Sequence, residues 1–356
     1  MSSKMKLVLE TGQEFQGEGF GASVPVVGEI VFNTSMVGYQ EILSDPSYSG
    51  NIVLMTYPLI GQYGITDEDY ESRSAGATGI VVREQCDTPS NFRFTKTISE
   101  EMEEHRIPGI SGLDTRMLTH IIREKGPLRA ALVPEQTSTS KALEMIRNMR
   151  DDKDPLAKVS CTKRWFSRTL HHKWDVVVLD CGVKHSIVKA LNGLGCNVTV
   201  VPYSSSVDEI MAFHPDGVLV SSGPGNPYLL GRTIEIINGL KGKVPLVGIG
   251  LGFELIALSY GVVLEKLTCG QHGGAPVRNV QTGKIITVEH NYTYAVKENS
   301  LDSTTLTVTY RNVADSTAVG IENRADRVSA VQFYAEGGPG VQVSEFFDSF
   351  IKAMED

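Results

Sequence analysis

The chain lacks the marks of a secreted, metal-binding or membrane protein. Its 356 residues include only five cysteines, and none of them forms a C-x-x-C pair. An odd and scattered set argues against a disulfide framework or a zinc site and favours a reducing compartment. No apolar run reaches the ~18 residues that a membrane span needs, and the N-terminal stretch has no signal-peptide core. We therefore expect a cytoplasmic protein that has no metal site and is not inserted in a membrane.

Positive charge is also scarce. Lys and Arg number 33 against 42 Asp and Glu, which gives a formal net charge of −9. An acidic chain lacks the basic surface by which proteins bind nucleic acid or anionic membranes. We expect neither as a partner.

The length and a change of pattern predict two domains. At about 150 residues per domain, 356 residues are too many for one. Residues 151–172 are polar and charged without steady periodicity, which is typical of a linker. The predicted domains are therefore residues 1–150 and residues 173–356.

The first domain is predicted to mix strands and helices. Short strands are expected at Leu7–Leu9, Glu29–Phe32, Asn51–Met55 and Thr78–Val82, and helices at Ile98–His105 and Thr115–Glu124. Asp114 is the expected N-cap of the second helix, because its carboxylate can accept from the free N–H groups of the first turn.

The second domain alternates apolar strands with helices, which predicts a mostly parallel sheet covered on both faces. Strands are expected at Asp175–Asp180, Asn197–Val201, Gly217–Ser221 and Pro245–Gly248, and later at Ile285–Glu289, Thr305–Thr309, Ala318–Glu322 and Ser329–Phe333. Helices are expected at His185–Leu194, Asp208–Phe213, Thr233–Leu240, Leu251–Tyr260 and Gln342–Met354.

Two glycine-rich loops follow predicted strands, where a doubly wound sheet binds its ligands. Ser222–Pro227 reads SGPGNP, and Gly248–Gly252 reads GIGLG between a strand and a helix. The second loop does not complete a dinucleotide fingerprint, but it fits the frame of a nucleophile elbow. The central residue of that elbow is Gly250, which has no side chain. Taken alone, the loop also fits a plain tight turn.

Longer motifs resemble a known family. GEIVFNTSMVGYQEILSDPSYSGNIVLMTYPLIG (28–61) and GISGLDTRMLTHIIREKGPLRAAL (109–132) are similar to the small, glutamine-hydrolysing subunit of carbamoyl phosphate synthetase. SGPGNP, PLVGIGLGFELIAL, GQHGGAPV and VSAVQFYAEGGPG are similar, in order, to a class I glutamine amidotransferase domain. The resemblance covers essentially the whole chain. It implies an α/β fold, with a mixed α/β N-terminal domain of the small-subunit type and a flavodoxin-like C-terminal amidotransferase domain.

The resemblance also implies a catalytic triad, and this chain departs from it. In the family an elbow cysteine attacks the side-chain amide of glutamine, and a histidine oriented by a glutamate assists proton transfer. The matching positions here hold Gly250, Tyr334 and Glu336, so only the glutamate is retained. No other cysteine replaces the nucleophile by sequence position, and Cys269 is interpreted as structural.

The implied glutamine pocket is partly altered. Its positions correspond to Ser47, Gly223, Gly225, Leu251, Glu254, Asn291, Thr293 and Tyr294. Glu254 replaces a glutamine and adds a possible negative charge. Thr293 replaces a glycine and Tyr294 a phenylalanine. A β-branched residue does not easily adopt glycine-like backbone angles, so we expect weaker glutamine binding.

We therefore expect a pseudoenzyme that forms a heteromer with a carbamoyl phosphate synthetase large subunit and supports an ammonia-dependent reaction. The chain itself would need no cofactor, while the large subunit would use ATP and bicarbonate for pyrimidine or arginine biosynthesis. Two alternatives remain: a binding module for another small molecule, and an active glutaminase with unusual groups.

One geometric expectation follows. Gly250 should lie at a sharp strand-to-helix turn facing the Gly223–Gly225 loop, with Tyr334 and Glu336 across the same cleft. Tyr334 would fill the volume of the missing side chains. The alternative is that Tyr334 turns into the core or solvent.

Overall fold

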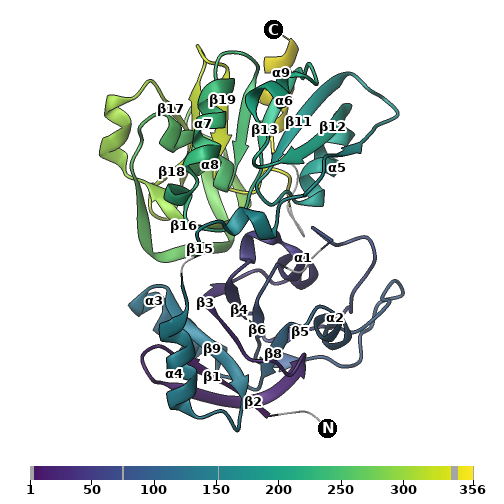
Figure 1. Ribbon diagram of the computed structural model, residues 1–356, viewed down its shortest axis with the longest axis vertical. Coiled ribbons are helices and arrows are strands. Elements are labelled where there is room, and N and C mark those ends of the chain that lie inside the picture. The colour runs from purple at the N-terminus through teal and green to yellow at the C-terminus, as the bar shows by residue number, and fades with distance from the viewer. Residues whose placement is uncertain (1–3, 74–75, 151, 338–343, 356) are drawn as a thin grey trace. The chain divides into compact units, whose positions relative to one another are not determined.

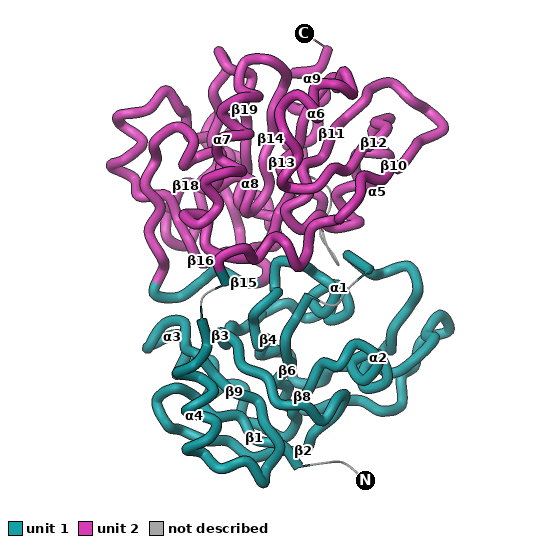
Figure 2. Tube along the Cα trace, in the orientation of Figure 1, with its two compact units in different colours: residues 1–152, 268–272 teal, residues 153–267, 273–356 magenta. Residues whose placement is uncertain are grey.

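The computed structural model describes residues 4–73, 76–150, 152–337 and 344–355. The chain forms two compact units, coloured separately in Figure 2. One comprises Met1–Asp152 with Thr268–His272, and the other comprises Lys153–Leu267 with Gly273–Asp356. Each unit is described by itself below.

The first unit is built on a closed barrel, with strand order β1-β2-β8-β6-β4-β3-β9 (Figure 1). Its barrel strands are β1 (Lys4–Leu9), β2 (Glu14–Gly21), β3 (Val26–Asn33), β4 (Asn51–Met55), β6 (Gly79–Val81), β8 (Pro108–Ser111) and β9 (Leu128–Pro134). A small separate sheet joins β5 (Leu59–Ile60) to β7 (Glu84–Gln85). The helices are α1 (Tyr39–Ser44), η1 (Pro46–Tyr48), α2 (Ile98–Glu104), α3 (Thr115–Lys125) and α4 (Thr139–Asn148).

Several barrel strands are apolar on both faces because they are covered on both sides. Leu7 of β1 belongs to one buried cluster, whereas its neighbour Val8 packs in another with Ala142 and Ile146 of α4. Successive side chains of a strand point to opposite faces, so β1 needs apolar residues at consecutive positions. Clean alternation was therefore not available as a signal for this strand.

Part of this unit was predicted from the sequence. The strands expected at Leu7–Leu9 and Asn51–Met55 and the helix expected at Thr115–Glu124 are present as β1, β4 and α3. Asp114 caps α3, since its Oδ1 accepts from the Met117 N–H at 2.9 Å. Strands β2, β8 and β9, helix α4 and barrel closure were not predicted. β2 reads EFQGEGFG, and its glycines and charges conceal the strand.

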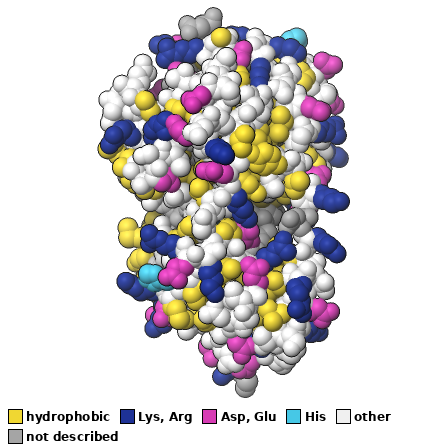
Figure 3. Space-filling model, turned by 90° about the vertical axis from the view of Figure 1, so that its left-hand side faces the viewer, with side chains coloured by type: hydrophobic (Ala, Val, Ile, Leu, Met, Phe, Trp, Pro, Cys, Tyr) yellow, Lys and Arg dark blue, Asp and Glu magenta, His cyan; other side chains and the backbone are white. Residues whose placement is uncertain are grey.

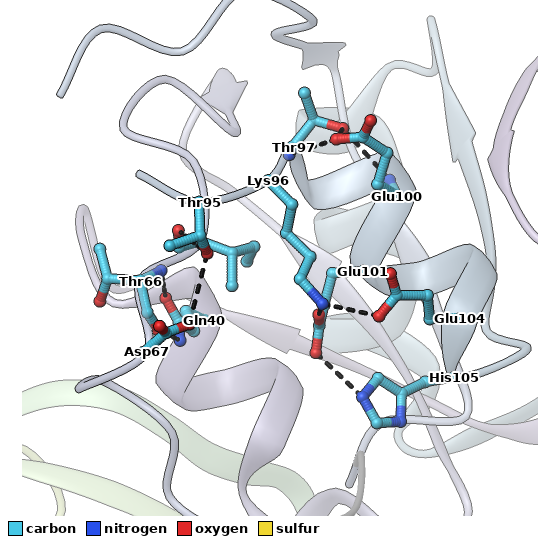
Figure 4. A network of polar contacts seen from close by, with 11 residues as sticks. Gln40, Thr66, Asp67, Thr95, Lys96, Thr97, Glu100, Glu101, Glu104 and His105 are labelled. Atoms are coloured by element: carbon cyan, nitrogen blue, oxygen red, sulfur yellow. Dashed lines mark hydrogen bonds and ion pairs between the residues drawn. The ribbon is translucent and has the colours of Figure 1, made fainter. Parts of the chain in front are cut away.

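A polar network around α2 shows how this unit buries a charge (Figure 4). The Glu101 side chain is 2% exposed, and its carboxylate pairs with Lys96 at 2.9 Å and with His105 at 3.0 Å. Lys96 also contacts Glu104 at 2.6 Å. Buried charges are tolerated where they are paired, so this cluster is adequately explained as structural.

The second unit contains a sheet in the order β10-β12-β11-β13-β14-β19-β18-β17-β15-β16 (Figure 1). Its strands are β10 (Trp165–Ser167), β11 (Trp174–Asp180), β12 (Cys196–Pro202), β13 (Gly217–Val220), β14 (Leu246–Ile249), β15 (Leu264–Asn279), β16 (Ile285–Val296), β17 (Thr307–Asn312), β18 (Ala318–Asn323) and β19 (Val328–Val331). Its helices are η2 (Pro155–Lys158), α5 (His185–Gly193), α6 (Val207–Met211), η3 (Pro227–Leu229), α7 (Gly231–Leu240), α8 (Leu251–Ser259), η4 (Glu298–Ser303) and α9 (Phe346–Glu355).

The centre of this sheet is parallel, as predicted. β11 pairs in parallel with β12 and β13, and β14 pairs in parallel with β13 and β19. The order β12-β11-β13-β14-β19 is the 2-1-3-4-5 order of flavodoxin-like folds, and such sheets bind ligands beyond the strands' carboxyl ends. The loops at 222–227 and 248–252 therefore lie at the edge where a site is expected.

Some segments differ from the expectation. The stretch predicted as a linker contains η2 and β10, and the described part of it from Lys153 clusters with the second unit. The GQHGGAPV segment, for which no strand was predicted, lies within the long strand β15. The last predicted helix begins at Gln342, which is outside the described residues. Within the range of that prediction, the structure describes the helix α9.

Part of β15 belongs to the barrel unit. The N–H and hydroxyl of Thr34 both donate to the His272 carbonyl, at 3.4 and 3.3 Å. The His272 ring lies 6.3 Å from the Tyr48 ring. A segment from the second half of the sequence therefore completes the first unit.

The surface drawn in Figure 3 carries Lys and Arg side chains interspersed with Asp and Glu. Charge is therefore not gathered in one patch on that face. Among the described residues, no helix is long and apolar enough to cross a membrane.

Candidate functional site

Gly250 lies at the turn between β14 and α8. It is the N-cap of α8, with φ 59° and ψ −114°. This backbone conformation strains a residue with a side chain and costs glycine little. Gly250 N–H donates to the Val331 carbonyl of β19 at 3.0 Å, which ties the turn to the neighbouring strand. The local geometry is that of the expected elbow, without a side chain at its centre.

The glycines around the elbow are required by close backbone packing. A Cβ at Gly252 would lie 2.2 Å from the Val220 carbonyl oxygen, and one at Gly223 would lie 1.9 Å from the Cys181 carbonyl oxygen. Both distances are far below van der Waals contact, so larger residues cannot be accommodated without moving the chain. Close backbone packing therefore requires glycine at both positions.

Tyr334 lies beside the elbow. A Cβ at position 250 would lie 3.2 Å from the Ser222 Cβ and 4.0 Å from the Tyr334 Cε1. Tyr334 is 7% exposed, and its N–H donates to the Glu289 carbonyl of β16 at 2.9 Å. The phenol oxygen accepts from Asn291 Nδ2 at 3.1 Å. The ring therefore does not turn away from the elbow into solvent.

A buried ion pair lies against the same ring. Lys184 Nζ lies 2.9 Å from Glu336 Oε1, and the two side chains are 5% and 0% exposed. The same ammonium lies 3.8 Å from the Tyr334 ring centroid, which is a cation–π contact. Glu336, at the position that the resemblance assigns to the triad glutamate, is therefore bound to a lysine that no sequence motif had indicated.

Lys184 could have been suspected from its place in the sequence. It lies shortly after β11, at the edge where a doubly wound sheet binds ligands. Its pairing with Glu336, 152 residues away, is visible only in the structure.

Glu254 is buried in the first turn of α8, and it is 5% exposed. Burial raises the pKa of Glu254 to about 8, while the hydrogen bond from Gln332 opposes this shift. Gln332 Nε2 donates to Glu254 Oε1 at 3.1 Å and to the Tyr294 carbonyl at 2.6 Å. Burial therefore favours the protonated carboxyl, which is neutral like the amide that the resemblance assigns to this position, over the possible negative charge.

The other pocket positions are distributed over several elements. Leu251 begins α8, and its Cδ2 lies 3.2 Å from a Cβ built at Gly223. Gly225 has φ 103°. Thr293 lies inside β16, where an extended backbone suits a β-branched residue, so the expected strain at this position is not required. Ser47 lies in η1 of the barrel unit, where its N–H donates to Asp45 Oδ1 at 2.8 Å.

Four of the five cysteines are poor candidates for a substitute nucleophile. Burial raises the pKa of the thiols of Cys161, Cys181, Cys196 and Cys269. A raised thiol pKa lowers the thiolate fraction on which cysteine reactivity depends. Among the described residues no cluster of three metal-ligating side chains occurs.

Comparison with known proteins agrees with both halves of the structure. Residues 7–132 match the carbamoyl-phosphate synthase small chain CPSase domain, and residues 177–354 match glutamine amidotransferase class-I. A carbamoyl phosphate synthase pyrimidine-specific small chain of Halalkalibacterium halodurans is 43% identical, over 99% of this chain and 97% of that protein. A carbamoyl phosphate synthase small chain of Staphylococcus epidermidis is 42% identical, over 100% and 97%.

Among solved structures, a glutamine amidotransferase of Thermotoga maritima aligns with a TM-score of 0.39 and 16% identity, over 52% of this chain and 84% of that one. The match of both domain models, together with full-length identity above 40%, settles the family. This chain belongs to the carbamoyl phosphate synthase small chain family, with an N-terminal small-chain domain and a C-terminal class I glutamine amidotransferase domain.

Proposed function

We propose that this chain is a small subunit that no longer hydrolyses glutamine. It binds a carbamoyl phosphate synthetase large subunit, which uses ATP, bicarbonate and free ammonia to make carbamoyl phosphate. The observation that carries the proposal is the elbow itself, where Gly250 supplies no nucleophile and the Tyr334 ring lies against the vacant position.

The expected loss of hydrolysis is large. Removing the nucleophile of a covalent hydrolase costs on the order of 10⁶ in turnover. A tyrosine, with a reference pKa near ~10, is a poor general base at neutral pH. The Glu336 carboxylate pairs with Lys184 at 2.9 Å, and the position that the resemblance assigns to the catalytic histidine holds Tyr334.

The proposed partner follows from the family, whose members include small chains named for carbamoyl phosphate synthase. The intact barrel unit and the intact turn at Gly250 support a retained folding and docking role. The free cysteines are compatible with the cytoplasm, where such a complex would supply pyrimidine or arginine synthesis.

The test is co-expression with the large subunit encoded by the same genome, followed by purification and assay of the complex. We expect co-purification, carbamoyl phosphate from ammonium, and no ammonia release from glutamine. Glutamine-dependent synthesis at a rate near that with ammonium would refute the loss of hydrolysis. A chain that never co-purifies with the large subunit would refute the docking role.

A Gly250→Cys variant tests whether only the nucleophile is missing or whether the rest of the catalytic site is missing as well. We expect it to release no ammonia, because its thiol would have no histidine to lower its pKa or to protonate the leaving amine. Robust turnover by this single variant would contradict the proposal that Tyr334 also disables the site.

A further inference from the structure

The Tyr334 side chain is fixed from several directions. Its backbone N–H is bound to Glu289, its hydroxyl accepts from Asn291, and its ring carries the Lys184 ammonium on its face. Lys184 is itself tied to Glu336, so the ring cannot swing into solvent without uncovering a buried ion pair.

The ring lies in van der Waals contact with the position that a side chain at residue 250 would take. A group that reacts with residue 250 must come within about 3–3.5 Å of that side chain. The Tyr334 Cε1 is only 4.0 Å from the position where the Cβ would begin, and Ser222 lies on another side at 3.2 Å. In addition, Asn291, a position that the resemblance assigns to glutamine binding, donates its amide hydrogen to the Tyr334 hydroxyl.

We propose that Tyr334 is a built-in occupant of the former glutamine pocket, which closes this chain to glutamine, and that Lys184 and Asn291 hold it in place. This inference rests on the proposed function and extends it from lost chemistry to lost binding. It also distinguishes the chain from a module that has exchanged glutamine for another small molecule, because the pocket is filled by the chain's own side chain.

Two features of the surroundings make the occupant stable. Tyr334 belongs to the buried cluster that also contains Phe333 and Phe347. Its polar atom is paired, whereas a buried phenol without a partner would be costly. A ring with these contacts is a permanent part of the fold rather than a gate that opens for each ligand.

The experiment combines calorimetric titration of glutamine with chemical rescue by p-cresol, which reproduces the tyrosine side chain. The wild-type chain is expected to give no binding heat with glutamine up to 10 mM. Tyr334→Ala is expected to lose thermal stability and to regain several degrees in Tm with p-cresol, since a ligand that binds only the native state raises stability. An engineered apolar cavity can bind a small aromatic molecule in this way.

The matched control is Tyr310→Ala. Tyr310 is 7% exposed, as Tyr334 is, and it lies in the same buried cluster beside Phe333, at a ring distance of 5.3 Å. If the rescue of Tyr334→Ala reflects the pocket, p-cresol should raise its Tm more than it raises that of Tyr310→Ala. Equal shifts would overturn the proposal.

A second variant keeps the test decisive if Tyr334→Ala does not fold. Tyr334→Phe keeps the ring and loses the hydroxyl that Asn291 contacts, so it should still give no binding heat with glutamine. Glutamine binding by the wild-type chain or by Tyr334→Phe, without hydrolysis, would refute the proposal that Tyr334 fills the pocket. It would leave the proposed function intact. Hydrolysis of glutamine by the wild-type chain would overturn the proposed function itself.

Discussion

Gly250→Ala tests whether the elbow survives as strained geometry. At φ 59° and ψ −114°, a side chain costs roughly 1–3 kcal/mol in backbone strain. The new methyl carbon would also lie 3.2 Å from the Ser222 Cβ, and an extra carbon in a packed site costs about 1–3 kcal/mol. Because small shifts relieve part of each cost, we expect a total loss of about 2–4 kcal/mol.

Two glycine variants in the same unit separate these contributions. Gly193, the last residue of α5, has open space around its Cβ position and no positive φ, so Gly193→Ala should be neutral or stabilising by up to about 1 kcal/mol. Gly261 has φ 83° with open space, so Gly261→Ala should cost only the backbone term, about 1–2 kcal/mol. The expected order of destabilisation is therefore Gly250, then Gly261, then Gly193.

The assay is urea unfolding followed by tryptophan fluorescence. The chain has two tryptophans, and both Trp165 in β10 and Trp174 in β11 belong to the unit that contains Gly250. The signal therefore reports that unit without interference from barrel unfolding. If Gly250→Ala loses no more stability than Gly193→Ala, the strained turn and its tight contact with Ser222 are not features of the protein in solution.

Three further predictions concern buried charge and capping. Glu254→Gln should gain stability over the wild type with rising pH. Because the pKa of Glu254 is raised from 4.5 to about 8, its stabilising contribution is complete below about pH 4.5 and is lost as pH rises to about 8. The free energies of unfolding of the two proteins, measured in urea, should therefore diverge by about 1.4 kcal/mol per pH unit in that window and differ by a constant amount above it. Lys184→Met and Glu336→Met should each cost about 3–5 kcal/mol in tryptophan-detected unfolding, because each leaves a buried charge without its partner. The double variant should recover most of the lost stability. Additive losses would contradict a coupled pair. Asp114→Ala should cost about 1 kcal/mol in the barrel unit, measured by hydrogen exchange of the backbone amides of its strands in urea. Asp114→Asn should cost less, since an amide oxygen can still accept from Met117.

The sequence by itself determined the family and showed which residue stands at the centre of the elbow. Long motifs specify the two domains, and Gly250 stands at the elbow in the sequence as plainly as in the structure. Runs such as DVVVLD also identify the central parallel strands, because a strand buried on both faces is apolar throughout. These are local signals that do not depend on what the rest of the chain does.

The barrel and the contacts around Gly250 and Tyr334 were decided only by tertiary structure. β2 lacks a strand pattern because its glycines meet other strands closely: a Cβ at Gly17 would lie 2.2 Å from the Ser111 carbonyl oxygen. Closure depends on pairs such as β1 with β9, which are more than 120 residues apart.

The charge states and ionic partners at the site were also decided by tertiary structure. Glu254 reads as a charge in the sequence, but its burial raises the pKa to about 8 and favours the neutral carboxyl. The position of Lys184 after β11 is visible in the sequence, but its contacts with Glu336 and the Tyr334 ring are made only by the fold. Charge state and partner are properties of the surroundings of a side chain, and distant segments supply those surroundings.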